Sequence, residues 1–248
     1  IKSVLTNSDN FISQGSFNSA FRISNVTTES GKKNYVLRMT DNLTCEGDKK
    51  NISNELLGLH YQTYFSKSIT SGGLGCEGIC KVYDFGKYEI SNSKYLPQIP
   101  SGNRQFTSKY GVYAFLEYLP GGELFDRIKS DRWVEMTQEE RVNKTRAIIK
   151  KLLQTLKFIH NAGYVHLDLK PENIMMVYGE NDNKPSNLSE ITDEEWYFLR
   201  DTEIKLIDFG FMKSKDEEKQ GRFGSPKYIS RDFYDNDVKK YNSNFDIW

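Results

Sequence analysis

The first half of the chain consists of short apolar runs separated by polar and turn-forming residues, a pattern that predicts β-strands. Four such segments are residues 10–23, 35–40, 79–85 and 110–117. Residues 51–64, between the second and third of these segments, predict a helix. The polar connection 96–108 contains Pro and Gly, and Pro120-Gly121-Gly122 ends the pattern. We therefore expect a small sheet with one helix in this half.

The pattern becomes helical in the second half. Thr137 and Glu140 have the spacing of a capping box, in which the Thr hydroxyl and the Glu carboxylate each satisfy an unpaired N–H at a helix start. Apolar residues follow at helical spacing, and we expect all of them in the core: Ile149, Leu152, Leu153, Leu156 and Ile159.

Residues 179–203 are rich in Asn, Asp and Glu and predict an inserted loop. Within this loop, residues 193–199 predict a short helix that carries Trp196, Tyr197 and Phe198. These aromatic side chains either pack locally or form a docking surface, and local packing is the simpler interpretation.

Composition and charge narrow the classes of function. Lys plus Arg and Asp plus Glu both number 34, so the chain has no charge excess for nucleic acid or an anionic membrane. No apolar run approaches the roughly 18–20 residues of a membrane helix. The cysteines, Cys45, Cys76 and Cys80, are too few for a disulfide framework and lack partners at metal-binding spacing. We therefore expect a cytoplasmic, intracellular protein without nucleic-acid binding or a membrane span.

Two segments of the second half contain the residue types that phosphoryl transfer needs. They are residues 166–173 (His-Leu-Asp-Leu-Lys-Pro-Glu-Asn) and residues 207–210 (Ile-Asp-Phe-Gly). Phosphoryl transfer between oxygens requires a carboxylate beside the incoming hydroxyl, cations on the phosphates and oxygen ligands for Mg²⁺. The candidate residues for these parts are Asp168, Lys170, Asn173 and Asp208.

These segments resemble the catalytic loop and the Asp-Phe-Gly motif of eukaryotic-type protein kinases, in the right order. Further resemblances are the phosphate-covering loop at 12–18, the β3 motif at 35–38, the αC glutamate at Glu55, the hinge at 116–123, the substrate-clamping segment at 224–228 and the start of the central helix at 246–248. The resemblance implies an α+β, bilobal protein-kinase fold. It divides the chain into a β-rich N-lobe with one helix (1–116), a hinge (117–122) and a mainly helical C-lobe (123–248).

The resemblance also implies a role for each matching residue. Asp168 would be the catalytic base, and Lys170 would stabilise the transferring phosphoryl group. Asn173 and Asp208 would bind Mg²⁺. ATP would be held by Ser13, Gly15, Phe17, Arg38, Glu55, Glu117, Leu119 and Glu123. Glu55 would pair with the cation at position 38, and an apolar stack joining the lobes would consist of His166, Phe209, Leu59 and Val82.

Residues 168–173 resemble the catalytic-loop motif of serine/threonine kinases. Ser225 supports this assignment, because such kinases usually have a hydroxyl residue at the corresponding position. Residues 165–175 are most similar to the myosin light-chain and death-associated kinases of the calmodulin-dependent group. The implied partners are a protein substrate with a Ser or Thr acceptor and a regulatory segment outside this chain. Glu123 and Glu172 imply basic residues upstream of the acceptor; the alternative is that Glu123 serves the ribose and Glu172 is solvated.

The chain departs from the family pattern at four places: Arg38 in place of Lys, Ser13 and Asn18 in place of two loop glycines, Leu167 in place of Arg, and Ser230-Arg231-Asp232 in place of Ala-Pro-Glu. An arginine fork is not interchangeable with an ammonium at a tight phosphate site. Side chains in the loop hinder close backbone approach to phosphates. These departures sustain a second interpretation, a pseudokinase that binds nucleotide without transfer. A small-molecule kinase is a third, disfavoured by the Lys-Pro-Glu-Asn wording and the clamp segment.

Two further expectations follow from the resemblance. Leu167 removes the positive charge that an activation-segment phosphate usually neutralises, and Ser214 is the only hydroxyl between Asp208 and Gly224. We therefore expect activation without phosphorylation of this segment. The chain stops at Trp248, in the first turn of the expected central helix, so we expect an incomplete domain that is unstable alone.

Overall fold

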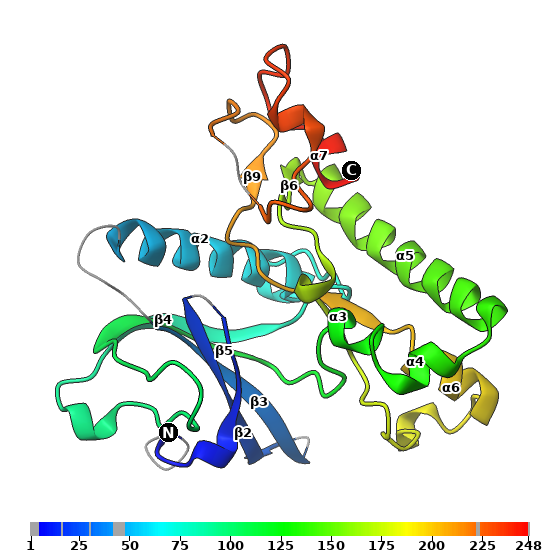
Figure 1. The fold of residues 1–248 in the computed structure, drawn as a ribbon, viewed down its shortest axis with the longest axis horizontal. Helices are drawn as coiled ribbons and strands as arrows, with labels where there is room; N and C mark the ends of the chain where they lie inside the picture. Colours follow the sequence, from blue (N-terminus) through cyan, green and yellow to red (C-terminus); the bar gives the residue numbers. More distant parts are fainter. Residues whose placement is uncertain (1–4, 16, 30, 42–47, 222–223, 248) are drawn as a thin grey trace. The chain divides into compact units, whose positions relative to one another are not determined.

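The computed structural model describes residues 5–15, 17–29, 31–41, 48–221 and 224–247, which form two compact units. The first unit lies within residues 1–63 and 81–118, and the second within residues 64–80 and 119–248. The sequence predicted one cut at 117–122, whereas the structure also assigns residues 64–80 to the second unit. Cys45 and Trp248 lie outside the described residues. Figure 1 gives the order of the elements.

The first unit contains an antiparallel sheet in the strand order β1-β2-β3-β5-β4. Its strands are β1 (Phe11–Gln14), β2 (Asn18–Thr28), β3 (Gly31–Thr40), β4 (Val82–Glu89) and β5 (Tyr110–Glu117). The predicted run 10–23 covers β1 and the first part of β2, the predicted run 35–40 covers the second part of β3, and β5 has the predicted bounds. β4 begins three residues later than predicted and extends to Glu89.

The two faces of this sheet have different coverings, because side chains alternate along each strand. On one face, Leu37 and Met39 of β3 are buried in a cluster. The other members of this cluster are Leu5, Phe21, Ile99 and Phe106. Arg38 lies between them in sequence and forms an ion pair with Glu55 of helix α2 (Asp48–Ser66). Helix α2 therefore covers the opposite face.

The connection between β4 and β5 contributes to the core of the first unit. It contains one short 3-10 turn, η3 (Ser93–Tyr95), and its Ile99 and Phe106 side chains are 6% and 4% exposed. The sequence predicted only a polar loop here. The correction has a simple cause: two apolar residues in a polar segment give no periodic signal, but they can still fix a loop to a sheet.

The second unit is mainly helical. Its helices are α3 (Leu124–Arg127), α4 (Asp131–Glu135), α5 (Gln138–Asn161), α6 (Asp193–Arg200) and α7 (Asn244–Ile247). Two short antiparallel ladders join β6 (Tyr164–Val165) to β9 (Lys213–Ser214) and β7 (Ile174–Met176) to β8 (Ile204–Leu206). The predicted capping box is confirmed: Thr137 and Glu140 exchange hydrogen bonds at the start of α5.

The predicted core stripe of α5 is partly wrong. Ile149 and Leu153 are 47% and 46% exposed, whereas Leu156 and Ile159 are buried as predicted. Ile148 is buried instead of its neighbour. Ile148, Leu156 and Ile159 repeat at intervals of eight and three residues, so they lie on one face of a helix with 3.6 residues per turn. The prediction had assigned residues from two adjacent faces of the helix, the exposed face of Ile149 and Leu153 and the buried face of Leu156 and Ile159, to one stripe.

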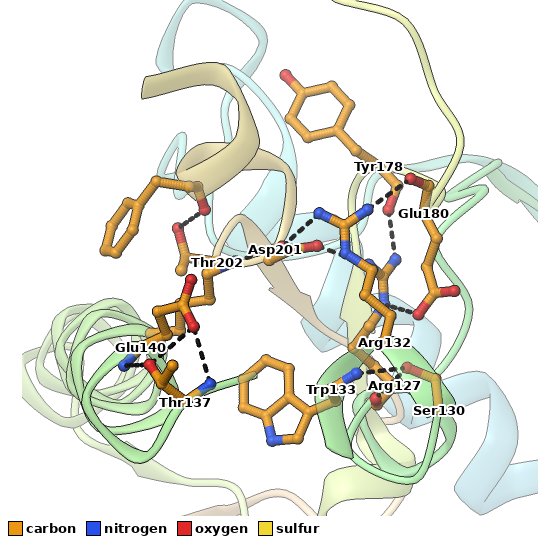
Figure 2. Close-up of polar contacts among 12 residues, drawn as sticks. Arg127, Ser130, Arg132, Trp133, Thr137, Glu140, Tyr178, Glu180, Asp201 and Thr202 are labelled. Carbon is orange, nitrogen blue, oxygen red and sulfur yellow. Dashed lines mark hydrogen bonds and ion pairs between the residues drawn. The ribbon is translucent and has the colours of Figure 1, made fainter. Parts of the chain in front are cut away.

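The insertion between β7 and β8 is tied to α3, α4 and α5 through Asp201, whose side chain is fully buried. Figure 2 shows the guanidinium groups of Arg127 and Arg132 directed at this carboxylate, with nitrogen–oxygen distances of 2.9 Å in both pairs. Lys144 of α5 also pairs with it. Arg127 and Arg132 further donate to the backbone carbonyls of Tyr178 and Glu180. Burial lowers the pKa of Arg127, whereas the negative charges of Glu180 and Asp201 raise it.

The predicted short helix of the insertion is confirmed as α6. Trp196 is 3% exposed and packs edge-to-face against Tyr178, with ring centroids 4.9 Å apart. Tyr197 and Phe198 are 52% and 41% exposed. Tyr197 also has a local partner, because the Arg200 guanidinium lies 4.9 Å from its ring centroid. Local packing therefore accounts for Trp196 and, in part, for Tyr197.

Candidate active site

The backbone of residues 166–168 is held in an uncommon conformation by Asp246 of α7. The Asp246 carboxylate accepts hydrogen bonds from the N–H groups of His166 and Leu167, both at 2.8 Å, and contacts His160 Nε2 at 2.7 Å. Leu167 has a φ of 69°, which is rare for a residue with a side chain. Such strained backbone is common at functional sites and requires support from its surroundings. Asp246 gives that support.

Asp168 lies at the centre of a hydrogen-bonded group. Its Oδ2 accepts from Lys170 Nζ at 2.8 Å and from Asn173 Nδ2 at 2.9 Å. Its Oδ1 accepts from the backbone N–H of Ser225 at 2.9 Å and from the Ser225 hydroxyl at 3.0 Å. Lys170 also donates to the Ser225 hydroxyl at 2.7 Å. The structure thus brings together Asp168, Lys170, Asn173 and Ser225, all four of which the sequence analysis singled out, and their roles in catalysis stay predictions.

The carboxyl group of Asp168 is ionised at neutral pH. Burial has the largest single effect and would raise its pKa, but the hydrogen bond and positive charge of Lys170, together with the hydrogen bonds of Ser225 and Asn173, outweigh burial. The pKa is therefore lowered below its ordinary value. An ionised carboxylate beside an ammonium group and a hydroxyl can orient an incoming hydroxyl and accept its proton.

Gly224 explains how Ser225 comes so close to the catalytic loop. Its φ is 98°, and a Cβ atom there would lie 2.5 Å from the backbone oxygen of Leu167. Only glycine fits both constraints. Steric constraints therefore explain why the first residue of the Gly224-Ser225-Pro226 motif is glycine.

His166 is fully buried and contacts Phe209 edge-to-face, with ring centroids 4.9 Å apart. Burial lowers the pKa of His166, more strongly than nearby carboxylates raise it. Its Nδ1 accepts from the backbone N–H of Asp168, and its Nε2 lies 3.3 Å from the carbonyl oxygen of Ile207. This half of the predicted apolar stack is present; Leu59 and Val82 belong to the first unit, and the complete stack stays a prediction.

Asn173 and Asp208 are brought near each other by the β7–β8 ladder, because each residue flanks one strand of the pair. The N–H of Ile207 donates to the carbonyl of Asn173 at 3.0 Å. Asp208 has a φ of 62°, and its Oδ1 accepts from Gly210 N at 3.3 Å. The Asn173 amide nitrogen holds Asp168 through its backbone and side-chain oxygens, so the amide oxygen Oδ1 is the atom that could serve as a metal ligand. Amide and carboxylate oxygens of this kind fit Mg²⁺.

Glu123 and Glu172 form an acidic pair in the second unit. Burial raises the pKa of Glu123, with further contributions from the negative charges of Asp126 and Glu172. The Oε2 atom of Glu172 is buried and has no hydrogen-bond partner among the described residues. A buried carboxylate oxygen without a donor is costly, and a cationic group would satisfy it.

The ion pair between Arg38 and Glu55, predicted from the sequence, is present in the first unit. The two side chains are only 16% and 14% exposed. Arg38 thus occupies the position of a cation on β3 that reaches the helix, although its role toward phosphate stays a prediction.

The remaining nucleotide-binding candidates lie in two places. Ser13, Gly15 and Phe17 are on the β1–β2 hairpin, all of them exposed, with Phe17 at 51%. Glu117 ends β5 and accepts a hydrogen bond from Lys81 N at 3.1 Å, while Leu119 is buried in the second unit. The binding roles of these residues stay predictions.

Leu167 is 6% exposed and packs in an apolar cluster. The other buried members are Val165, Phe233, Tyr241 and Phe245. Three aromatic pairs in this cluster have ring centroids 4.8–6.4 Å apart. The departure from the family pattern at this position therefore coincides with an apolar environment.

Comparison with known proteins agrees with this geometry. Residues 80–248 match the family model described as the protein kinase domain. The match covers more than half of the chain, and the chain belongs to the protein kinase domain family.

Among curated proteins, the chain is 32% identical to smooth muscle myosin light chain kinase from Gallus gallus over 161 residues, which are 64% of this chain and 7% of that protein. It is 29% identical to calcium/calmodulin-dependent protein kinase type 1 from Caenorhabditis briggsae over 144 residues, 58% of this chain and 33% of that protein. Both belong by name to the branch predicted from the catalytic loop. The chain spans a third or less of the length of these relatives. In the parts of the chain that the structure describes, no helix has the length and apolar character to cross a membrane.

Proposed function

We propose that this chain catalyses transfer of the γ-phosphoryl group of Mg-ATP to a Ser or Thr hydroxyl of a protein substrate. The observation that supports this most directly is the hydrogen-bonded group of Asp168, Lys170, Asn173 and Ser225. Every member of the group has a part to play in phosphoryl transfer, and a chain that only binds nucleotide needs no ionised carboxylate in contact with an ammonium and a hydroxyl.

In the proposed reaction, Asp168 orients the acceptor hydroxyl and takes its proton on a carboxylate oxygen. The Ser225 hydroxyl indicates how such a group is recognised, because it donates to Asp168 and accepts from Lys170. Lys170 stabilises negative charge on the group in transfer. Bound Mg-ATP supplies the phosphoryl group and the charge of the metal. Asn173 and Asp208 would hold the metal through their oxygen atoms.

The acidic pair of Glu123 and Glu172 supports a finer proposal for the substrate. A peptide Arg or Lys upstream of the acceptor would bring a positive charge to this pair of carboxylates. It would also relieve the like-charge repulsion that contributes to the raised pKa of Glu123. We infer a preference for basic residues at these substrate positions.

A pseudokinase is the second candidate, and the observations that favour it are Arg38 on β3 and the side chains of Ser13 and Asn18 in the phosphate-covering loop. Both candidates predict nucleotide binding, whereas only the first predicts transfer. A transfer assay therefore separates them, and a binding assay does not.

The test is transfer of labelled phosphate from Mg-ATP to a Ser/Thr peptide library by the full-length protein, with Asp168→Asn as the variant. Asn keeps the shape of the side chain but cannot take the proton, so we expect activity to fall by about 10²-fold or more while ATP affinity changes little. Asp216→Asn is the matched control, because Asp216 is exposed and lies outside this group. Nucleotide binding without measurable transfer by the wild type would establish the pseudokinase instead.

A further inference from the structure

Asp41, directly after β3, is the centre of a buried polar network in the first unit. Its side chain is fully buried, and its Oδ2 accepts from Gln14 Nε2 at 3.1 Å and from Ser19 Oγ at 3.3 Å. Arg104 Nη2 lies 3.1 Å from the same oxygen. Its Oδ1 accepts from the backbone N–H of Thr107 at 3.3 Å. A buried carboxylate is tolerated here because it has several donors and one cation.

The donors come from two segments that are far apart in sequence. Gln14 and Ser19 belong to the phosphate-covering hairpin, which we define as residues 11–21. Arg104 and Thr107 belong to the β4–β5 connection, defined as residues 90–109 (Figure 1). Asp41 therefore joins the hairpin to the connection.

Direct contacts strengthen this joint at the turn of the hairpin. Arg104 Nη2 donates to the carbonyl of Gly15 at 3.4 Å, and Gln14 Nε2 donates to the carbonyl of Arg104 at 2.9 Å. The carbonyl of Phe17, on the other side of the turn, accepts from the N–H of Asp41 at 2.6 Å. Both sides of the turn thus have a fixed partner outside the hairpin.

The β4–β5 connection, which contains Arg104, is fixed to the sheet by buried apolar side chains. Ile99 and Phe106, on either side of Arg104 in sequence, are buried in the apolar cluster that covers the sheet. The Arg104 side chain itself is 34% exposed. An anchored arginine loses less conformational entropy on forming its contacts than one on a free loop, so it can restrict the hairpin effectively.

We propose that Arg104 is a positioning residue for the phosphate-covering hairpin, acting through Asp41 and Gly15 to hold the turn in one conformation before nucleotide binds. The proposal deepens the proposed function and rests on it for the identity of the ligand. Preorganisation of this kind offsets the loss of two loop glycines at Ser13 and Asn18, because a hairpin already in place costs less entropy to close over phosphates.

The first test measures the hairpin itself and does not depend on the proposed function. Hydrogen–deuterium exchange of the full-length protein without nucleotide is compared for wild type, Arg104→Ala and Lys94→Ala. Lys94 is the matched control, since it is a cation of the same connection that contacts Tyr95 and not the hairpin. We expect faster exchange in residues 11–21 for Arg104→Ala alone, with exchange in the α5 helix unchanged.

The second test measures ligands. The hairpin would cover phosphates and not the base, so Arg104→Ala should weaken binding of Mg-ATP by about three- to tenfold, the range for one partly exposed charged hydrogen bond. Adenosine affinity should stay unchanged. Arg104→Lys, which keeps the charge beside Asp41, should recover part of the ATP affinity. A purely structural role would weaken ATP and adenosine equally.

The outcomes are distinguishable. Unchanged exchange in residues 11–21, or equal loss of ATP and adenosine binding, overturns the positioning role of Arg104. If exchange rises as expected but the wild type binds no ATP, the positioning role stands and the proposed function fails.

Discussion

The substitution Leu167→Arg would place a guanidinium group in the apolar cluster beside the catalytic loop. Leu167 is 6% exposed, and its neighbours include the aromatic rings of Phe233, Tyr241 and Phe245. Losing the burial of a leucine side chain costs about 1.5–3 kcal/mol. A buried charged group with incomplete hydrogen bonding adds about 1–3 kcal/mol. We therefore expect a total loss of roughly 2.5–6 kcal/mol, a large share of a typical stability of about 5–15 kcal/mol.

Urea unfolding of the full-length protein, followed by circular dichroism, measures this loss directly. Leu167→Met is the control, because a substitution that conserves volume should cost less than about 1.5 kcal/mol. An arginine variant as stable as the methionine variant would refute the reasoning. It would mean that the position accepts the charge that the family usually places there.

Three further predictions concern activity. Phosphatase treatment and Ser214→Ala should each leave most activity intact, because Leu167 offers no charge for an activation-segment phosphate; loss of most activity in either experiment would contradict this. Arg38→Ala should raise the Michaelis constant for ATP or abolish transfer, and Arg38→Lys should preserve or improve transfer. An Arg38→Ala variant with the kinetics of the wild type would refute the cation role of Arg38. A peptide-library profile should favour Arg or Lys upstream of the acceptor, and Glu172→Gln should flatten it by about 1.5–3 kcal/mol of discrimination; a flat or acidic wild-type profile would count against the acidic pair.

Much of the five-stranded sheet and the three longest helices, α2, α5 and α6, could be predicted from the sequence because these elements have a local signal. β5 occupies residues 110–117, the same range as its apolar run, and Thr137 with Glu140 begins α5 as its spacing predicts. The stripe of α5 was less predictable. Ile149 and Leu153 have a helical spacing of their own, and only tertiary packing decides which of two adjacent stripes faces the core.

The catalytic-loop residues could be found from the sequence because their types and order are characteristic. The residues that hold them in place could not. Asp246 supports the backbone of His166 and Leu167 from about 80 residues further along the chain, and nothing local in its sequence identifies those partners. The partner of Arg104 could not be predicted either, because its contact with Asp41 joins two segments that are far apart in sequence and that no periodic pattern connects. The unpartnered oxygen of Glu172 likewise becomes visible only in three dimensions.

The most direct test of the central claim is phosphoryl transfer by the full-length wild type beside Asp208→Asn, with the modified residue located by mass spectrometry. Asp208 would hold the metal with Asn173, so its charge is required for Mg-ATP to bind productively. We predict transfer to Ser or Thr by the wild type in Mg²⁺, none in EDTA, and a loss of about 10²-fold or more in the variant. Equal phosphate incorporation by wild type and Asp208→Asn, or none by the wild type despite bound Mg-ATP, would contradict the proposed kinase activity.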